Sequence, residues 1–169
     1  IFSLQSWTKA DDIRDFEIEG ISLGDSLLDY MSEKEIIEDN PFYYKNNKYA
    51  IVTCLSKASM YDYVNCTYKP SDLKRKKIHS VEGVILFDNK IDECLKKRKS
   101  IENELSNMFK NTKKNDYGTY NHGWDKSGES KQTVTDFNFK NGDLARVTCN
   151  NWSDKITKKY NYVDELKVS

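Results

Sequence analysis

One segment of the chain occurs twice. Residues 42–54 read FYYKNNKYAIVTC and residues 137–149 read FNFKNGDLARVTC, and the two segments align without a gap. Seven of the thirteen positions are identical, including Thr53/Thr148 and Cys54/Cys149. Each copy has aromatic and apolar residues on both sides of a short stretch rich in Lys and Asn, which is typical of a β-hairpin. The chain is therefore expected to build two related halves, with a cysteine at the same place in each.

The two hairpins are expected to share one turn geometry, at residues 45–48 and 140–143. Both turns carry Asn or Gly residues that tolerate the positive φ of a tight hairpin turn. A two-residue turn places large side chains opposite one another on one face. The pairs that it predicts are Tyr44 with Tyr49 and Phe139 with Leu144.

Helical segments are expected before each hairpin. Ser22 with Asp25, and Ser32 with Glu35, have the spacing of capping boxes, so short helices in a helix–turn–helix arrangement are predicted over 22–38. Residues 90–109 have the strongest helical pattern, because their apolar side chains fall on one stripe. The stripe consists of Ile91, Cys94, Leu95, Ile101, Leu105, Met108 and Phe109.

The remaining pattern is mostly that of strands. Further strands are predicted at 61–68, 79–87, 133–139, 144–150 and 159–168. Residues 1–15 resemble an entry strand or a loose arm, and the polar residues 110–130 resemble a long loop. The predicted fold class is α+β: a single domain of duplicated units, 16–88 and 89–169. In each unit a helix precedes an antiparallel meander and packs on one face of the sheet.

The four cysteines favour disulfides over a metal site. The sequence has no CxxC and only two histidines, His79 and His122, so it offers no plausible zinc set. Two disulfides in an exported protein are the first interpretation, and four buried free thiols in a cytosolic protein are the alternative.

Among the three possible pairings we expect Cys54–Cys66 and Cys94–Cys149. If strands 49–54 and 61–68 pair around Met60, Cys54 lies opposite Cys66 at about the separation that a disulfide needs. Cys94, on the apolar helix stripe, is then left to reach Cys149 on a strand.

Charge and hydropathy exclude several classes of function. Lys+Arg and Asp+Glu number 27 each, so no net charge favours nucleic acid or an anionic membrane. No run reaches the roughly 18–20 apolar residues of a membrane span. No phosphate loop, dinucleotide fingerprint or nucleophile motif is present, and no cofactor is predicted. The start at Ile1 without Met fits a mature protein after removal of a signal peptide, and equally a trimmed chain.

The segment 117–125 holds the densest group of polar and aromatic side chains. Exposed Tyr and Trp are common anchors in protein interfaces, so a binding surface is predicted here. The alternative is a surface loop whose aromatic side chains fold back onto the sheet. His122 near Asp125 suggests an acid–base pair, but the sequence offers no nucleophile for a hydrolase. The candidate binding residues are Tyr117, Tyr120, His122, Trp124 and Asp125.

Two resemblances accompany these patterns. Short helices that lead into an antiparallel meander, twice in tandem with one disulfide per half, resemble the β-lactamase inhibitory protein family. The stretch Glu19–Leu28, EGISLGDSLL, is similar to the opening of that superfamily, which small lipoproteins of the outer-membrane assembly machinery share. IEGISLGDSLLDYMSEKEI, and FKNGD followed by CNNWS, resemble uncharacterised small exported proteins of AT-rich marine bacteria, and this likeness implies export.

Together these features predict an exported protein, periplasmic or secreted, that is not an enzyme. It would act as a binding or inhibitor-like module of unknown ligand, and the expected partner is another protein of the cell envelope. An envelope-associated scaffold, lipid-anchored upstream of Ile1, and an uncharacterised hydrolase are the alternatives.

Overall fold

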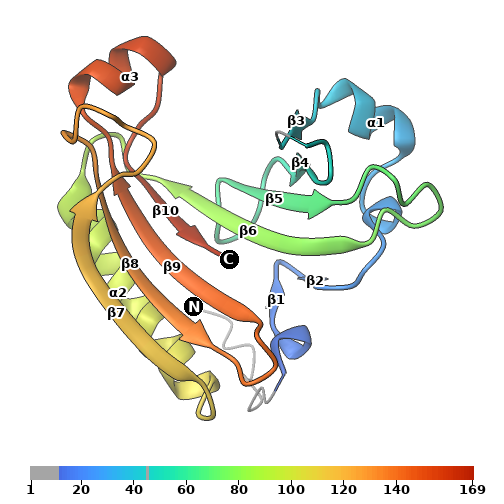
Figure 1. Ribbon diagram of the computed structural model, residues 1–169, viewed down its shortest axis with the longest axis horizontal. Helices are drawn as coiled ribbons and strands as arrows, with labels where there is room; N and C mark the ends of the chain where they lie inside the picture. The colour runs from blue at the N-terminus through green and yellow to red at the C-terminus, as the bar shows by residue number, and fades with distance from the viewer. Residues whose placement is uncertain (1–11, 45) are drawn as a thin grey trace. The chain divides into compact units, whose positions relative to one another are not determined.

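The structure is a computed structural model that describes residues 12–44 and 46–169. The chain divides into two compact units, Arg14–Ile85 and Leu86–Val168, which we call the N-terminal and C-terminal units. Helices and antiparallel strands occur in both, which confirms the α+β class (Figure 1). Within the described residues, no helix combines the length and the apolar character that a membrane crossing requires. The predicted entry strand or arm falls mainly on residues 1–11, outside the described residues; Ile13–Asp15 form a 3₁₀ helix.

The N-terminal unit is a short helical region followed by a four-stranded antiparallel meander. The strands follow one another in the order β3-β4-β5-β6. The elements are β1 (Glu17–Ile18), β2 (Ile21–Ser22), the 3₁₀ helix η2 (Leu27–Asp29), α1 (Glu33–Glu38), β3 (Phe42–Tyr43), β4 (Ala50–Leu55), β5 (Tyr63–Tyr68) and β6 (Ile78–Leu86).

Capping explains where the two short helices begin. Ser32 and Glu35 form the predicted capping box at the start of α1, with Glu35 N–H donating to Ser32 Oγ at 3.2 Å. The predicted helix start at Ser22 is wrong. The Asp25 carboxylate does accept the Ser22 N–H at 2.9 Å, but Ser22 belongs to β2, and Ser26 caps η2.

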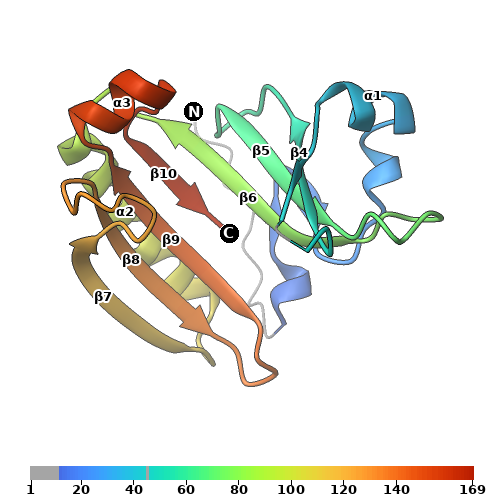
Figure 2. The same ribbon diagram turned by 45° about the horizontal axis from the view of Figure 1, so that its top comes forward.

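The C-terminal unit has a long helix and a second four-stranded meander, in the order β7-β8-β9-β10 (Figure 2). Helix α2 packs against β9 and β10 on one face of these strands (Figure 1). The elements are α2 (Ile91–Met108), β7 (Lys113–Asn121), β8 (Lys131–Asn138), β9 (Leu144–Asn151), α3 (Asp154–Tyr160) and β10 (Glu165–Val168).

Two sequence predictions for this unit are wrong. Much of the predicted loop 110–130 is strand β7, which pairs with β8 along its length apart from a bulge between Asp116 and Gly118. β7 lies at the edge of its sheet, and most of its side chains are exposed, so it lacks the apolar alternation that marks a strand. The predicted strand 159–168 is also too long, because α3 extends to Tyr160 and is ended by Asn161 in the left-handed conformation.

Both repeated segments form antiparallel hairpins, as predicted, and their turns begin alike. Asn47 N–H donates to Tyr44 O at 2.7 Å, and Gly142 N–H donates to Phe139 O at 3.1 Å. Asn47 and Gly142 occupy equivalent positions and both have positive φ. Lys45, in the first predicted turn, is outside the described residues.

The return strands of the two hairpins differ by one residue. In the first hairpin Tyr44 N–H donates to Tyr49 O at 3.1 Å, which agrees with the predicted pair. In the second hairpin Phe139 N–H donates to Asp143 O at 2.9 Å, and Leu144 pairs with Asn138. The prediction that Phe139 pairs with Leu144 is therefore wrong, because three residues rather than two form that turn.

The disulfides Cys54–Cys66 and Cys94–Cys149 are both present as predicted. The strand register predicted for the first pair is wrong, because Cys66 lies opposite Val52 and not opposite Cys54. A bulge between Thr53 and Leu55 shifts the register, and the two cysteines remain close enough, with a Cα–Cα distance of 5.6 Å. The second disulfide joins α2 to β9.

The inner face of α2 carries charges as well as apolar side chains. Cys94, Ile101 and Leu105 are buried as predicted, but Arg98 and Glu102 are buried beside them. Glu102 forms ion pairs with Arg98 at 3.4 Å, with Lys99 at 3.2 Å and with Lys114 of β7. Arg98 also donates to Thr135 Oγ1 at 2.6 Å and to Asp116 at 3.2 Å. This charged network connects the helix to β7 and β8.

Candidate functional site

Asp125 fixes the connection between β7 and β8. Its Oδ1 accepts the Ser127 N–H at 2.9 Å, and its Oδ2 accepts the N–H and the hydroxyl of Ser130 at 3.0 and 2.6 Å. The Ser153 hydroxyl donates to the same oxygen at 3.3 Å, and the Ser153 N–H donates to Ser130 Oγ at 3.0 Å. Since Ser153 is the N-cap of α3, these bonds tie the β7–β8 connection to the start of that helix.

The hydrogen bonds to Asp125 stabilise its ionised form. Side-chain donation from Ser130 and Ser127 and the backbone N–H of Ser127 hold the pKa of the carboxyl well below its usual range, and burial only partly opposes this. A carboxyl whose pKa is lowered by folding stabilises the native state above its unfolded pKa, about 3.9 for Asp. That contribution is lost as the pH falls from there toward the folded pKa.

We expect Asp125→Asn to reduce the acid sensitivity of the protein as well as its stability at neutral pH. Below about pH 4 the wild-type free energy of unfolding should fall more steeply than that of the variant, because only the wild type takes up a proton at this position on unfolding. Urea denaturation from pH 7 downward measures both slopes. Asp154→Asn, at an exposed position on α3, is the control. Parallel slopes for the wild type and Asp125→Asn would contradict the expectation.

Five aromatic side chains gather beside this anchored connection, and we call them the aromatic cluster. The His122 and Trp152 rings lie 4.4 Å apart, and Trp152 also contacts Trp124 at 5.9 Å and Tyr162 at 5.2 Å between ring centroids. Trp124 and Tyr160 are 5.0 Å apart with an edge-to-face geometry. The members are His122, Trp124, Trp152, Tyr160 and Tyr162.

The cluster has a buried inner ring and an exposed outer layer. Trp152 is buried, whereas Trp124, Tyr160 and Tyr162 are 48%, 40% and 42% exposed. The left-handed residue Asn161 ends α3 between the two tyrosines, whose rings lie 5.8 Å apart. The three outer rings are therefore held in place by contacts with one another and with Trp152, while a large part of each faces solvent.

His122 and Asp125 are close in sequence but serve different partners. His122 Nδ1 accepts the Trp124 N–H at 3.3 Å, and its ring packs against Trp152 at an interplanar angle of 51°. Burial lowers the pKa of His122 and favours the neutral imidazole. The Asp125 carboxylate is directed to Ser127, Ser130 and Ser153. In this geometry the carboxylate does not orient the imidazole, as a general base would require.

The structure separates the predicted binding residues into two groups. His122, Trp124 and Asp125 belong to the aromatic cluster or its anchor. Tyr117 and Tyr120 project from β7, where both are exposed, and neither makes a ring contact with the cluster. Both tyrosines add to the raised pKa of Arg146, whose main cause is its hydrogen bond to Asp136, so they lie within electrostatic reach of that β9 side chain.

Three cluster members were not predicted from the sequence: Trp152, Tyr160 and Tyr162. One sequence feature could have indicated them. Within eleven residues the segment 152–162 holds one Trp and two Tyr, next to a serine that can cap a helix. The strand predicted at 159–168 concealed this feature. An extended strand would carry Tyr162 away from Trp152, whereas the intervening helix brings the two side chains together.

No protein-family model matches the sequence, and neither a curated protein nor a solved structure matches it.

Proposed function

We propose that the chain is a non-enzymatic binding module, inhibitor-like in the sense that it acts by occupying a surface of another protein. The aromatic cluster is its contact surface. The observation that carries the proposal is the outer layer of Trp124, Tyr160 and Tyr162, which is exposed and yet fixed on buried Trp152 and on the Asp125 anchor.

Pre-organised aromatic rings suit protein recognition for two physical reasons. Trp and Tyr offer a large apolar area with few rotatable bonds, and each has a polar atom for a hydrogen bond. Rings that are already held by their neighbours lose little conformational entropy on binding, so more of the contact energy appears as affinity.

We propose that the module works outside the cytoplasm, in the periplasm or as a secreted protein. All four cysteines are paired in disulfides. Disulfides persist in oxidising compartments and are rare in the cytosol. Purification of the native protein followed by non-reducing peptide mapping tests this part of the proposal. Four alkylatable thiols in the native protein would contradict it.

We also propose that the two units are diverged copies of one ancestral unit. In each unit a helix precedes the antiparallel strands that hold the repeated segment, α1 before β3 and β4, and α2 before β8 and β9. The proposal is supported by three equivalent pairs in the repeated segments, whose members are all buried. These pairs are Ala50/Ala145, Val52/Val147 and Cys54/Cys149.

If the aromatic cluster is the contact surface, removal of one exposed ring should greatly weaken the binding of the partner protein. Wild-type protein immobilised under oxidising conditions should retain a stoichiometric protein from the extracellular or periplasmic fraction of the organism that produces it. Once that protein is purified, Trp124→Ala should weaken its binding at least ~30-fold, since an interface anchor contributes roughly 2 kcal/mol or more. Isothermal titration calorimetry measures the change.

Tyr117→Ala is the matched control for this experiment. Tyr117 is an exposed aromatic residue of the same unit and lies outside the cluster. Its replacement should change the affinity by less than about twofold, as is usual for residues outside the centre of an interface. A partner that binds the wild type and Trp124→Ala equally would refute the proposed surface, provided that the melting temperatures of the two proteins agree.

A further inference from the structure

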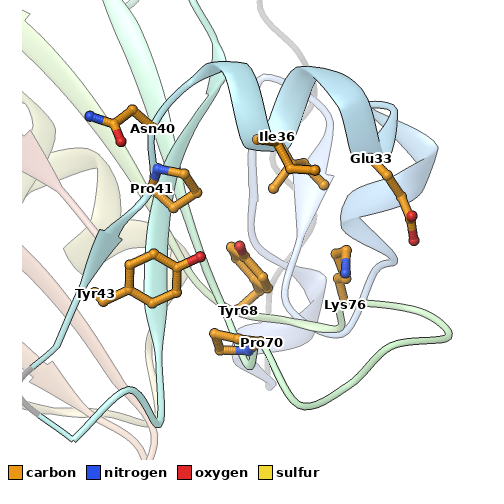
Figure 3. A pocket seen from close by; sticks show the side chains of 9 residues that line it. Glu33, Ile36, Asn40, Pro41, Tyr43, Tyr68, Pro70 and Lys76 are labelled. Atoms are coloured by element: carbon orange, nitrogen blue, oxygen red, sulfur yellow. The ribbon is translucent and has the colours of Figure 1, made fainter.

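The N-terminal unit has a cleft of about 350 Å³ under the outer strand of its sheet (Figure 3). Ile36 of α1 and Tyr68 of β5, both buried, contribute to its lining. Tyr43 of β3 lies across from them, and burial together with the nearby Tyr43 side chain raises the pKa of Tyr68. The lining residues are Glu33, Ile36, Ile37, Asn40, Pro41, Tyr43, Tyr68, Pro70 and Lys76.

Large apolar side chains on β3 and at the end of α1 are exposed. Ile37 is 75% exposed and Phe42 is 67% exposed, and Tyr43 and Tyr44 are each nearly half exposed. β3 is the edge strand of its sheet. Natural edge strands are normally protected by charges, bulges or a covering segment. Three consecutive exposed aromatic residues on such an edge therefore indicate a surface that a further segment covers.

The second hairpin shows what covers the equivalent position. Tyr43 lies opposite Ala50 in the first hairpin, as Phe137 lies opposite Ala145 in the second. Phe137 is fully buried, and its ring contacts Phe109, which directly follows α2, at 6.1 Å. In addition, β7 pairs along the outer edge of β8. An aromatic side chain and an added strand thus cover the second hairpin at the position that is open in the first.

Among the described residues β3 is an edge strand, and its backbone directs hydrogen-bonding groups away from β4 toward such a strand. Because Tyr44 N–H donates to Tyr49 O, Tyr44 belongs to a hydrogen-bonded pair of the antiparallel ladder. The preceding residue, Tyr43, is then in a non-hydrogen-bonded pair, so its N–H and C=O point away from β4. Pro41 lacks an N–H and limits the pairing to a short stretch. The side chain in the cleft must therefore supply much of the affinity.

We propose that the cleft and the outer edge of β3 bind an extended segment of another protein. The segment adds to β3 as an antiparallel or parallel strand and places a large apolar side chain, preferably aromatic, between Tyr43, Ile36 and Pro70. The bound segment would cover the first hairpin in the way that β7 and Phe109 cover the second. This is strand addition with a specificity pocket. The site is distinct from the aromatic cluster, and it stands or falls independently of the function proposed for that cluster.

A random-peptide display library, selected on the full-length oxidised protein, tests the proposal. Enriched peptides should share one aromatic or large aliphatic residue in a segment without internal proline. Synthetic copies of these peptides should bind in fluorescence anisotropy, and Ile37→Asp and Tyr43→Asp should each weaken them at least tenfold. Ile37 is so exposed that its replacement leaves the core unchanged, which keeps the test valid if Tyr43→Asp fails to fold.

Met60→Asp is the matched control, because it places the same charge at an exposed apolar side chain of the same unit that does not line the cleft. Peptide affinity for this variant should stay within about twofold of the wild type, since a residue outside a contact surface contributes little to binding. Bound peptide should also slow hydrogen exchange at the Tyr43 amide. Failure to enrich any peptide, or equal binding to the wild type and Ile37→Asp, would overturn the proposal. So would a wild-type dimer that Ile37→Asp converts to a monomer, because a second copy would then be the occupant.

Discussion

Replacing Glu102 with alanine should lower the free energy of unfolding by about 3–5 kcal/mol. Glu102 is completely buried between α2 and β7 and forms ion pairs with Arg98, Lys99 and Lys114. Burial opposes ionisation of the carboxyl, but hydrogen bonds from Lys114 and Lys99 outweigh it and lower the pKa of Glu102. Removing this carboxylate leaves the buried guanidinium of Arg98 with only the half-exposed carboxylate of Asp116 as an opposite charge.

Glu104→Ala, on the same helix, is the control for this prediction. Glu104 is exposed and accepts a hydrogen bond from Ser100 at 3.2 Å. Its replacement should change the free energy of unfolding by no more than about 0.5 kcal/mol. Urea denaturation followed by circular dichroism measures both variants. A loss below about 1 kcal/mol for Glu102→Ala would show that the network contributes little net stability, as some buried ion pairs do.

The Cys94–Cys149 disulfide should contribute more stability than Cys54–Cys66. Cys94–Cys149 closes a loop between residues 55 apart, and Cys54–Cys66 closes a loop between residues only 12 apart. In the chain-entropy model these separations correspond to about 4 and about 3 kcal/mol, because the longer loop removes more freedom from the unfolded chain. Cys94–Cys149 also joins α2 to β9, so its loss removes the covalent link between the helix and the sheet.

Paired serine variants make this comparison. Cys94→Ser with Cys149→Ser, and Cys54→Ser with Cys66→Ser, each remove one disulfide and leave no unpaired thiol. The denaturation midpoint of the first double variant should be the lower of the two, measured without reductant. The reverse order would show that native-state contacts around Cys54, and not the entropy of the unfolded chain, decide the contribution.

Local signals in the sequence were sufficient for several elements of the fold. The capping box at Ser32 and Glu35 and the apolar stripe of residues 90–109 depend on neighbours within one or two helical turns, so they can be recognised without the tertiary structure. The disulfide pairing could be predicted because each cysteine lies on an element whose pattern was clear. Trp124 could be recognised as a binding candidate because it lies in a polar segment and because Trp is enriched among the residues that anchor protein interfaces.

The features that could not be predicted depend on contacts between distant residues. β7 has polar side chains at nearly every position, and only its pairing with β8 identifies it as a strand. Arg98 and Glu102 follow the helical period as charged residues, and nothing local shows that Lys114 and Thr135 would allow their burial. Trp152 and Tyr162 meet Trp124 only because α3 folds back between them.

The one-residue difference between the two hairpin turns has an evolutionary consequence. Successive side chains of a strand point to opposite faces, so a slip of one residue exchanges its inner and outer positions. Phe137 lies opposite Ala145 in the core, whereas Phe42, at the same place in the repeat, lies opposite Ile51 and faces solvent. The duplication proposed above would thus give a new surface to one copy through the geometry of a turn alone, while the residue itself remains the same.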